Sequence, residues 1–226
     1  VSCLAADRIY FNSVYHMESF LDEAPRFLKH YRDYNELDSV DNIRAKSKVL
    51  YLGMDLKRFD ESPRQELSPG RLPLILWNHR WEYDKNPNDF FEALFELALD
   101  GIEFEVAILG ENFRNEPTEF LNAKEKLGPR VVQFGYAESF EEYTKWLSVS
   151  DIVPVTSNQD FFGGSLVEAM YCGCYPLLPK RLAFPEHIPS DLHELFYYEN
   201  QRDLVSRLRE LILNIDRTRR QETKQF

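Results

Sequence analysis

The chain has 226 residues and a formal net charge of −11 at pH 7; 43% of its residues are hydrophobic and 29% are charged. This composition is typical of folded domains and excludes disordered and low-complexity proteins, while the length allows one large domain or one domain plus part of another. The negative charge excludes a general binder of phosphate backbones, because affinity for polyanions comes mainly from Lys and Arg. No apolar run reaches the length of a membrane span, so we expect a soluble protein with no membrane partner.

The cysteines and histidines bear on cofactors and on the cellular compartment. Three cysteines, an odd number without metal-ligand spacing, favour reduced thiols and a cytoplasmic location. The five histidines form no ligand-spaced pair either, so we expect no metal and no other cofactor. The chain begins at Val1 without a signal-type segment, and we expect it to be an interior piece of a longer protein.

Strand-like and helix-like segments alternate along the chain, which predicts an α/β fold with a Rossmann-like, doubly wound parallel sheet. A strand over 7–12 and a helix capped by Ser13 form the first βα unit. Residues 33–46 are polar and lack a clear period, so we expect a crossover between domains there, followed by a brief strand over 48–52. A proline-rich loop over 61–72 then leads into an apolar strand over 72–77.

The later elements repeat the same pattern. A helix begins at Asn86 and Pro87 and ends at Gly101. The remaining predicted elements are strands over 104–109, 131–134, 152–155, 175–178 and 195–198, and helices over 119–127, 140–147, 163–172 and 203–215. Parallel sheets bind ligands at the carboxyl ends of their strands, so the loops 78–85, 110–113, 134–137 and 156–164 should hold the site.

Two cations occur in the first of these loops. Arg80 offers a planar fork and Lys85 a point charge, which together suit a diphosphate. The alternative is that they form surface salt bridges with Glu82 and Asp84. Spacing alone does not separate these two interpretations.

A glycine loop running into a helix, from Asp160 to Met170, is the second candidate. Backbone N–H groups at a helix N-terminus favour anions, and glycine allows a ligand close to the backbone. Glu168 could accept hydrogen bonds from the paired hydroxyls of a ribose, and Asp160 could do so from sugar hydroxyls. The alternative is that Asp160 is only a cap or loop residue and Glu168 a solvated helix carboxylate.

These residues resemble a known family. Arg80 with Lys85, the turn at Gly110, and the run from Asp160 to Gly173 are similar to the donor domain of family 4 GT-B retaining glycosyltransferases. That family carries two Glu residues with seven residues between them on the glycine-loop helix; here Asp160, shorter by one methylene, takes the first position and Glu168 the second. The stretch 53–59 looks like the family's entry into the donor domain.

More local strings, over 75–87, 161–163 and 168–176, look like the branch of that family that attaches mannose to queuosine in tRNA. The resemblance implies that residues 1–60 are a remnant of the N-terminal acceptor domain with the interdomain crossover. Residues 61–226 would form the donor-binding domain, the C-terminal half of a GT-B fold. It also implies GDP-mannose as the donor and a tRNA as the acceptor, held through the N-terminal half.

The resemblance further implies roles for single residues. Arg80 and Lys85, with the amides of Phe162, Gly163 and Gly164, would stabilise charge on the leaving diphosphate without a metal. Asp160 would orient the hexose and Glu168 the ribose. The predicted binding residues are Gly110, Tyr136, Phe162, Gly163, Gly164 and Ser165. Tyr136 would lie near the base, with simple core packing as the alternative.

Two other functions stay open at this point. One is a family 4 transferase acting on a glycan or a lipid carrier, and the other is a nucleotide-sugar-binding module without turnover. We expect the chain alone to be inactive, because acceptor contacts would lie mainly in the N-terminal half. Trp77 and Trp81 are expected to pack in the core or loops and not to stack on bases.

Overall fold

The computed structural model describes residues 2–31, 35–61, 68, 70–110 and 117–219. The chain divides into two compact units. The first consists of Val1–Met54, Asp160–Gly163 and Arg181–His187, and the second of Asp55–Gln159, Gly164–Lys180 and Ile188–Phe226. The predicted domain boundary after residue 60 stays a prediction.

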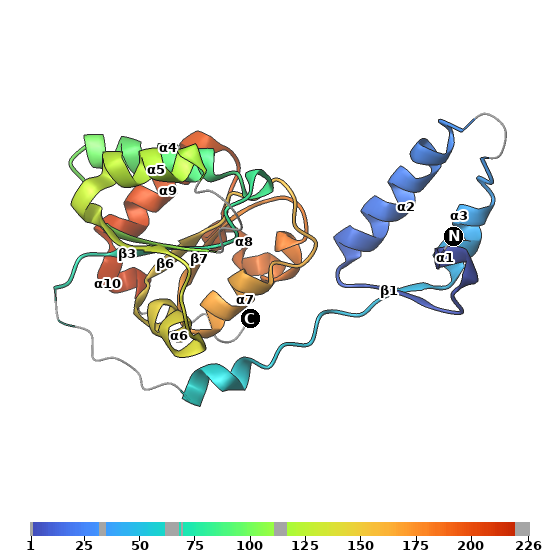
Figure 1. The fold of residues 1–226 in the computed structure, drawn as a ribbon, viewed down its shortest axis with the longest axis horizontal. Coiled ribbons are helices and arrows are strands. Elements are labelled where there is room, and N and C mark those ends of the chain that lie inside the picture. The colour runs from blue at the N-terminus through green and yellow to red at the C-terminus, as the bar shows by residue number, and fades with distance from the viewer. Residues whose placement is uncertain (1, 32–34, 62–67, 69, 111–116, 220–226) are drawn as a thin grey trace. The chain divides into compact units, whose positions relative to one another are not determined.

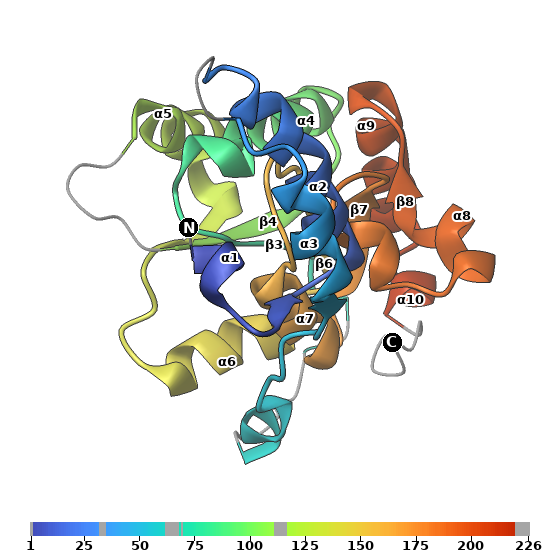
Figure 2. The ribbon, with the colours of Figure 1, turned by 90° about the vertical axis from the view of Figure 1, so that its right-hand side faces the viewer.

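The first unit is a small α/β layer. Its elements are α1 (Ser2–Ala5), β1 (Ile9–Phe11), α2 (Val14–Leu28), α3 (Ser39–Ala45) and β2 (Ser47–Val49). The two strands pair in parallel, and α2 and α3 lie side by side above them (Figure 2). The predicted cap is confirmed, because the Ser13 hydroxyl accepts a hydrogen bond from the His16 amide at 3.0 Å.

Helix α3 corrects the prediction of an irregular crossover over 33–46; residues 32–34 lie outside the described part of the chain. Val40 and Ile43 have the i, i+3 spacing that places two side chains on one helix face. Both are buried and form a small core with Leu21 of α2. Two apolar residues in a polar segment are too few to show a period.

The second unit is built on a six-stranded, entirely parallel sheet with the order β5-β4-β3-β6-β7-β8, which confirms the predicted α/β class (Figure 1). Its strands are β3 (Leu74–Asn78), β4 (Glu105–Leu109), β5 (Val131–Gly135), β6 (Ile152–Pro154), β7 (Tyr175–Pro179) and β8 (Tyr197–Tyr198). Its helices are α4 (Pro87–Leu99), α5 (Thr118–Leu127), α6 (Phe140–Val149), α7 (Gly164–Tyr171), α8 (His193–Phe196), α9 (Gln201–Leu213) and α10 (Ile215–Thr218). Helices α4, α5 and α9 cover one face of the sheet, and α6 and α7 cover the other (Figure 1).

The apolar strands of this unit lie in its core. Every residue of β3 and β7 is buried, as expected for parallel strands with helices on both faces. An aromatic cluster lies between the sheet and its α4 side, where Trp81 stacks on Phe120 with ring centroids 4.3 Å apart. Trp77 and Trp81 are both buried, which confirms that they are packing residues.

One strand prediction was wrong in part. Residues 193–196 form helix α8, and only Tyr197 and Tyr198 of the predicted strand 195–198 pair with β7. The Tyr175 hydroxyl donates to the Leu195 carbonyl at 2.6 Å, so the helical turn is fixed by a contact from outside it. The predicted loop 61–72 lies largely outside the described residues, and before it Leu56–Glu61 forms a 3-10 helix, η1.

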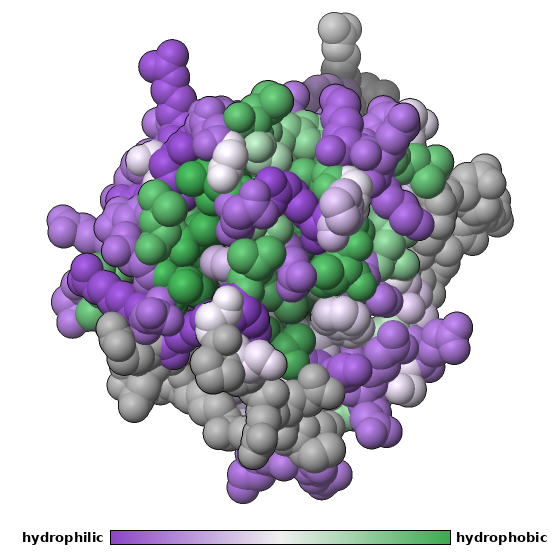
Figure 3. Space-filling view, turned by 90° about the vertical axis from the view of Figure 1, so that its left-hand side faces the viewer, coloured by the Kyte–Doolittle hydropathy of each residue, from purple (hydrophilic) through white to green (hydrophobic). Residues whose placement is uncertain are grey.

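Figure 3 shows the side of the molecule at which β3 begins. Apolar side chains lie among hydrophilic ones on this surface. In the part of the chain that the structure describes, no helix combines the length and apolarity needed to cross a membrane.

Candidate functional site

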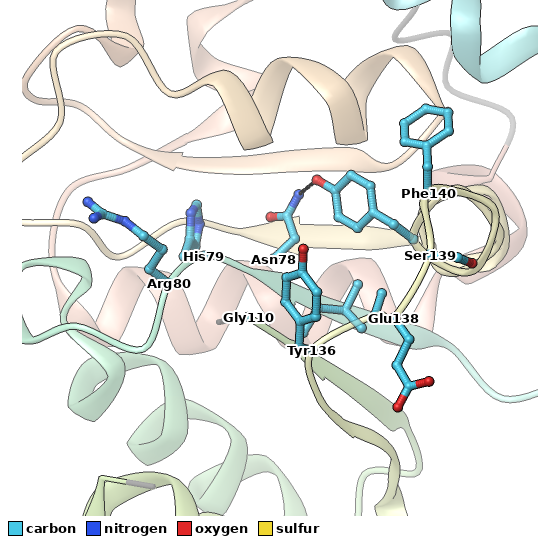
Figure 4. A pocket seen from close by; sticks show the side chains of 11 residues that line it. Asn78, His79, Arg80, Gly110, Tyr136, Glu138, Ser139 and Phe140 are labelled. Carbon is cyan, nitrogen blue, oxygen red and sulfur yellow. Dashed lines mark hydrogen bonds between the residues drawn. The ribbon is translucent and has the colours of Figure 1, made fainter. Parts of the chain in front are cut away.

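The carboxyl ends of β3, β4 and β5 open into a cleft of about 370 Å³ in the second unit (Figure 4). This volume lies within the range of small-molecule sites. The cleft is lined by Asn78, His79, Arg80, Leu109, Gly110, Tyr136, Ala137, Glu138, Ser139, Phe140 and Tyr143. The predicted gathering of loops at this edge is therefore confirmed for 78–80, 110 and 136–137, while 111–113 lie outside the described residues.

Gly110 forms the floor of the cleft at the end of β4. Its φ of 148° lies in a region that side-chain-bearing residues rarely adopt. A Cβ at this position would lie 2.3 Å from the His79 carbonyl oxygen and 2.6 Å from the Trp81 ring. Only glycine fits here, because both neighbours are held by the core.

The loop 136–139 forms one wall of the cleft and is fixed by the start of α6. The Ser139 hydroxyl accepts from the Glu142 amide at 3.1 Å, and the Glu142 carboxylate accepts from the Glu138 amide at 2.9 Å. Ser139 is thus the N-cap of α6, and Glu142 lies at the third helical position as in a capping box, but it bonds the amide of Glu138, one residue before the cap. Tyr136 is 65% exposed, so the alternative that it simply packs in the core is wrong.

Arg80 lies at the opposite wall, and its guanidinium pairs with Glu82 at 3.1 Å. Lys85 is buried; its ammonium contacts the Asp84 carboxylate at 3.2 Å and donates to the Gln159 carbonyl at 3.1 Å. Both salt bridges of the alternative interpretation are thus present. The Arg80 side chain is 54% exposed, and such surface pairs contribute little, so this pair does not prevent Arg80 from binding an anion in the cleft.

Glu168, in the second turn of α7, is not the solvated carboxylate of the alternative interpretation. Its side chain is only 14% exposed. One carboxylate oxygen accepts from the Arg58 guanidinium at 2.8 Å, and the other accepts from the Tyr143 hydroxyl at 2.8 Å. Burial, and then the nearby Glu168 carboxylate, raise the pKa of Tyr143, so its hydroxyl stays protonated and acts as a donor.

The first turn of α7 is anchored to the end of β3. Helix α7 begins at Gly164, and the Ser165 carbonyl accepts from the Asn78 side-chain amide at 2.7 Å. The Ser165 hydroxyl lies 3.0 Å from Nδ1 of His79. Ser165 therefore contacts two cleft residues, although it does not line the cleft itself.

Three predicted site residues, Asp160, Phe162 and Gly163, belong to the first unit. One Asp160 carboxylate oxygen accepts from the Phe162 amide at 3.0 Å, a local turn that agrees with a loop role. Gly163 has a φ of 83°, which favours glycine. The Phe162 carbonyl is hydrogen-bonded to the ring of His187.

The site thus brings Arg80, Gly110 and Tyr136 together in one cleft, and Glu168 joins it through Tyr143. Among the residues that the structure describes, no three His, Cys, Asp or Glu side chains are grouped as metal ligands would be. Sequence reasoning missed Tyr143 and Arg58 as neighbours of Glu168. The only available signal was the Arg-Phe pair in the 53–59 stretch.

A doubly wound parallel sheet with a cleft at its carboxyl edge is the architecture of nucleotide-binding α/β domains. Residues 58–225 match the family model described as "Glycosyl transferases group 1", and the chain belongs to that family. Residues 1–54 match a second model, "tRNA-queuosine alpha-mannosyltransferase N-terminal".

Individual relatives agree with this assignment. The tRNA-queuosine alpha-mannosyltransferase of Drosophila melanogaster is 39% identical over an alignment of 199 residues that covers 84% of this chain and 52% of that protein. The chain thus spans about half the length of this curated relative.

Solved structures share the fold. A glycosyltransferase from Rickettsia africae superposes with a TM-score of 0.69 at 18% identity, covering 97% of this chain and 56% of the other. The C-terminal domain of a group 1 glycosyltransferase from Francisella tularensis gives 0.62 at 20% identity, covering 76% of this chain and 95% of that domain.

Proposed function

We propose that this chain is the donor-binding part of a retaining mannosyltransferase that transfers mannose from GDP-mannose to queuosine in a tRNA anticodon. The cleft at the ends of β3, β4 and β5 is the observation that carries the donor site, since it combines an exposed cation, a glycine floor and an aromatic wall. The family match over 1–54 and the Drosophila relative support mannose as the transferred sugar and queuosine as the acceptor.

The proposed roles follow from the chemistry of each group. Arg80 and Lys85, with the amide of Gly164, bind the diphosphate and stabilise its charge when the bond from the anomeric carbon to the phosphate oxygen breaks. The electron pair leaves with the diphosphate, the acceptor oxygen forms the new bond on the same face of the sugar, and the proton of the acceptor hydroxyl passes to the leaving diphosphate oxygen. Glu168 binds the ribose, while the roles expected of Asp160, Phe162 and Gly163, which belong to the first unit, stay predictions.

The other proposed binding residues shape the site. Gly110 presents its backbone to the ligand at the end of β4, and Tyr136 packs against the base. Gly164 and Ser165 present the first turn of α7 to the diphosphate. The protein acts in the cytoplasm, where its tRNA acceptor is found.

A thermal-shift titration with GDP, UDP, ADP and their sugars tests the donor site, because a ligand that binds only the native state raises apparent stability by about 2.7 kcal/mol at a hundredfold excess over Kd. We expect GDP and GDP-mannose to stabilise the chain most and the effect to weaken in Arg80→Ala. Arg130→Ala is the matched control, since Arg130 pairs with Glu103 outside the cleft. No shift with any nucleotide would contradict the proposal.

The acceptor is tested separately with the full-length protein. Transfer of mannose from GDP-mannose to tRNA that contains queuosine, and not to tRNA that lacks it, is the expected result. Transfer only to a glycan or lipid carrier, or nucleotide binding without any transfer, would favour the two other functions. We expect the 226-residue chain alone to bind nucleotide without transferring sugar; transfer by it would contradict that expectation.

A further inference from the structure

The Glu168 carboxylate is held from two sides by residues of two other elements. Arg58 lies on η1, which precedes the sheet, and Tyr143 lies on α6. Each contacts a different carboxylate oxygen at 2.8 Å. A carboxylate oxygen has two lone-pair sites, so each oxygen can still accept one more hydrogen bond.

The direction of the Tyr143 hydrogen bond is fixed by its other partner. The Asn78 amide nitrogen donates to the Ser165 carbonyl at 2.7 Å and approaches the Tyr143 hydroxyl oxygen at 3.5 Å, which Figure 4 draws as a dashed line. An amide nitrogen only donates, so the Tyr143 proton is left to point at Glu168. The chain of hydrogen bonds thus runs from the end of β3 to the carboxylate.

Arg58 is held in place by packing as well as by charge. Its guanidinium carbon lies 4.5 Å from the centroid of the Phe140 ring, and Phe140 lines the cleft. Phe59 next to it is buried against the Phe140 ring at 5.0 Å. The Asp60 carboxylate accepts from the Tyr171 hydroxyl at 2.6 Å, which further fixes η1 on the unit.

We infer that Arg58 and Tyr143 are positioning residues that hold the Glu168 carboxylate in the orientation of a double acceptor for the two ribose hydroxyls of the donor. The inference rests on the proposed donor site. It assigns to this network the preference for ribonucleotides over 2′-deoxyribonucleotides.

Isothermal titration of GDP and 2′-deoxy-GDP into wild type and variants tests the inference. The dissociation constant of 2′-deoxy-GDP divided by that of GDP reports the contact with the ribose 2′-hydroxyl, and effects of a variant on base and diphosphate binding cancel in this ratio. We expect the ratio to fall about 5-fold in Tyr143→Phe and in Arg58→Gln, the equivalent of one lost hydrogen bond, and about as far in Glu168→Gln.

Two matched controls separate positioning from general damage. Tyr175→Phe removes a tyrosine hydrogen bond elsewhere in the second unit, the one that its hydroxyl donates to the Leu195 carbonyl. Arg130→Gln removes an arginine that, like Arg58, pairs with a carboxylate and lies over a phenylalanine ring, that of Phe104 at 5.0 Å. Both controls should keep the wild-type ratio.

The outcomes are distinct. A wild-type ratio in both Tyr143→Phe and Arg58→Gln, with a lowered ratio in Glu168→Gln, would overturn the inference while leaving the donor site intact. A wild type that binds no nucleotide would overturn the proposed function and the inference with it. If Arg58→Gln fails to fold, Arg58→Lys replaces it. Arg58→Lys keeps the charge but loses the planar stack on the Phe140 ring, so its ratio should lie between that of wild type and that of Tyr143→Phe.

Discussion

The carboxylate of Asp151 accepts two hydrogen bonds from the guanidinium of Arg219, at 2.8 and 3.2 Å. Arg71 donates two more, at 2.6 and 2.8 Å, and the Leu74 amide donates another at 2.8 Å. Asp151 is buried just before β6, so this cluster joins the segments that precede β3 and follow α10. The two guanidinium groups satisfy a charge whose burial would otherwise cost several kcal/mol.

Asp151→Ala should therefore lower the free energy of unfolding of the second unit by about 3–5 kcal/mol, because two partly buried arginines lose their shared partner. Urea unfolding followed by tryptophan fluorescence measures this, since all three tryptophans lie in this unit. Asp100→Ala is the control, because the Asp100 pair with Arg209 is exposed and should contribute less than about 1 kcal/mol. Equal losses in the two variants would argue against the assigned role.

Gly110→Ala should destabilise the second unit by about 3 kcal/mol or more, because the new methyl group meets a fixed carbonyl and a buried indole. Gly101→Ala is the matched control. Gly101 also has a positive φ, of 73°, but nothing lies within 4 Å of a Cβ there, so only the backbone cost of about 1–2 kcal/mol applies. The same tryptophan signal compares them, and a Gly110→Ala variant as stable as Gly101→Ala would show that the β4 turn can shift.

Cys174 should resist alkylation in the native protein. It is fully buried, its thiol donates to the Leu147 carbonyl at 3.2 Å, and burial raises its pKa well above the usual value. Mass spectrometry after brief iodoacetamide treatment at pH 8 should find Cys3 and Cys172, which are partly exposed, modified before Cys174. In urea all three should react, and equal native rates would contradict the burial of the thiol.

The stability of the first unit should fall below neutral pH because of His187. Burial lowers the pKa of this imidazole from its usual 6.5, while its hydrogen bond to Phe162 opposes the shift. The imidazole of the unfolded chain then binds a proton near pH 6.5, whereas the native state binds it only at lower pH. The full stability is therefore present above pH 6.5 and is lost as the pH falls. The loss should reach up to about 1 kcal/mol by pH 5.5.

His187→Gln removes this proton linkage while keeping a side-chain donor. Urea midpoints from circular dichroism at pH 7.5 and 5.5 should differ more in wild type than in His187→Gln. The exposed His30 serves as the control, and His30→Gln should behave as wild type. A steeper pH dependence in His187→Gln than in wild type would mean that folding raises the pKa of this imidazole instead of lowering it.

The elements that could be predicted from sequence are those whose own residues carry the signal. Strand β3 is uniformly apolar, and α4 begins at a proline and ends before a glycine with positive φ. Helix α8 could not be predicted, because Leu195 and Phe196 look strand-like and their turn is stabilised by Tyr175, twenty residues earlier. Local preference there yields to a tertiary contact.

The residues of the candidate site also fall into those that could be predicted from the sequence and those that could not. Positions at strand ends, such as Arg80 and Gly110, follow from the rule that ligands bind at the carboxyl edge of a parallel sheet. Tyr143 and Arg58 do not, because their contact with Glu168 depends on how α6 and η1 pack beside α7. No spacing along the chain encodes that distance.

The packing of α9 on α4 has a consequence for synthesis of the protein. Leu204, Val205, Leu208 and Ile212 close the same core that contains Phe90, Leu94 and Leu97 of α4. These two helices lie more than a hundred residues apart in the sequence, and a ribosome adds about 5–20 residues per second. The nascent chain must therefore carry an open aromatic core for several seconds, which makes this interval the point at which a chaperone would have most to protect.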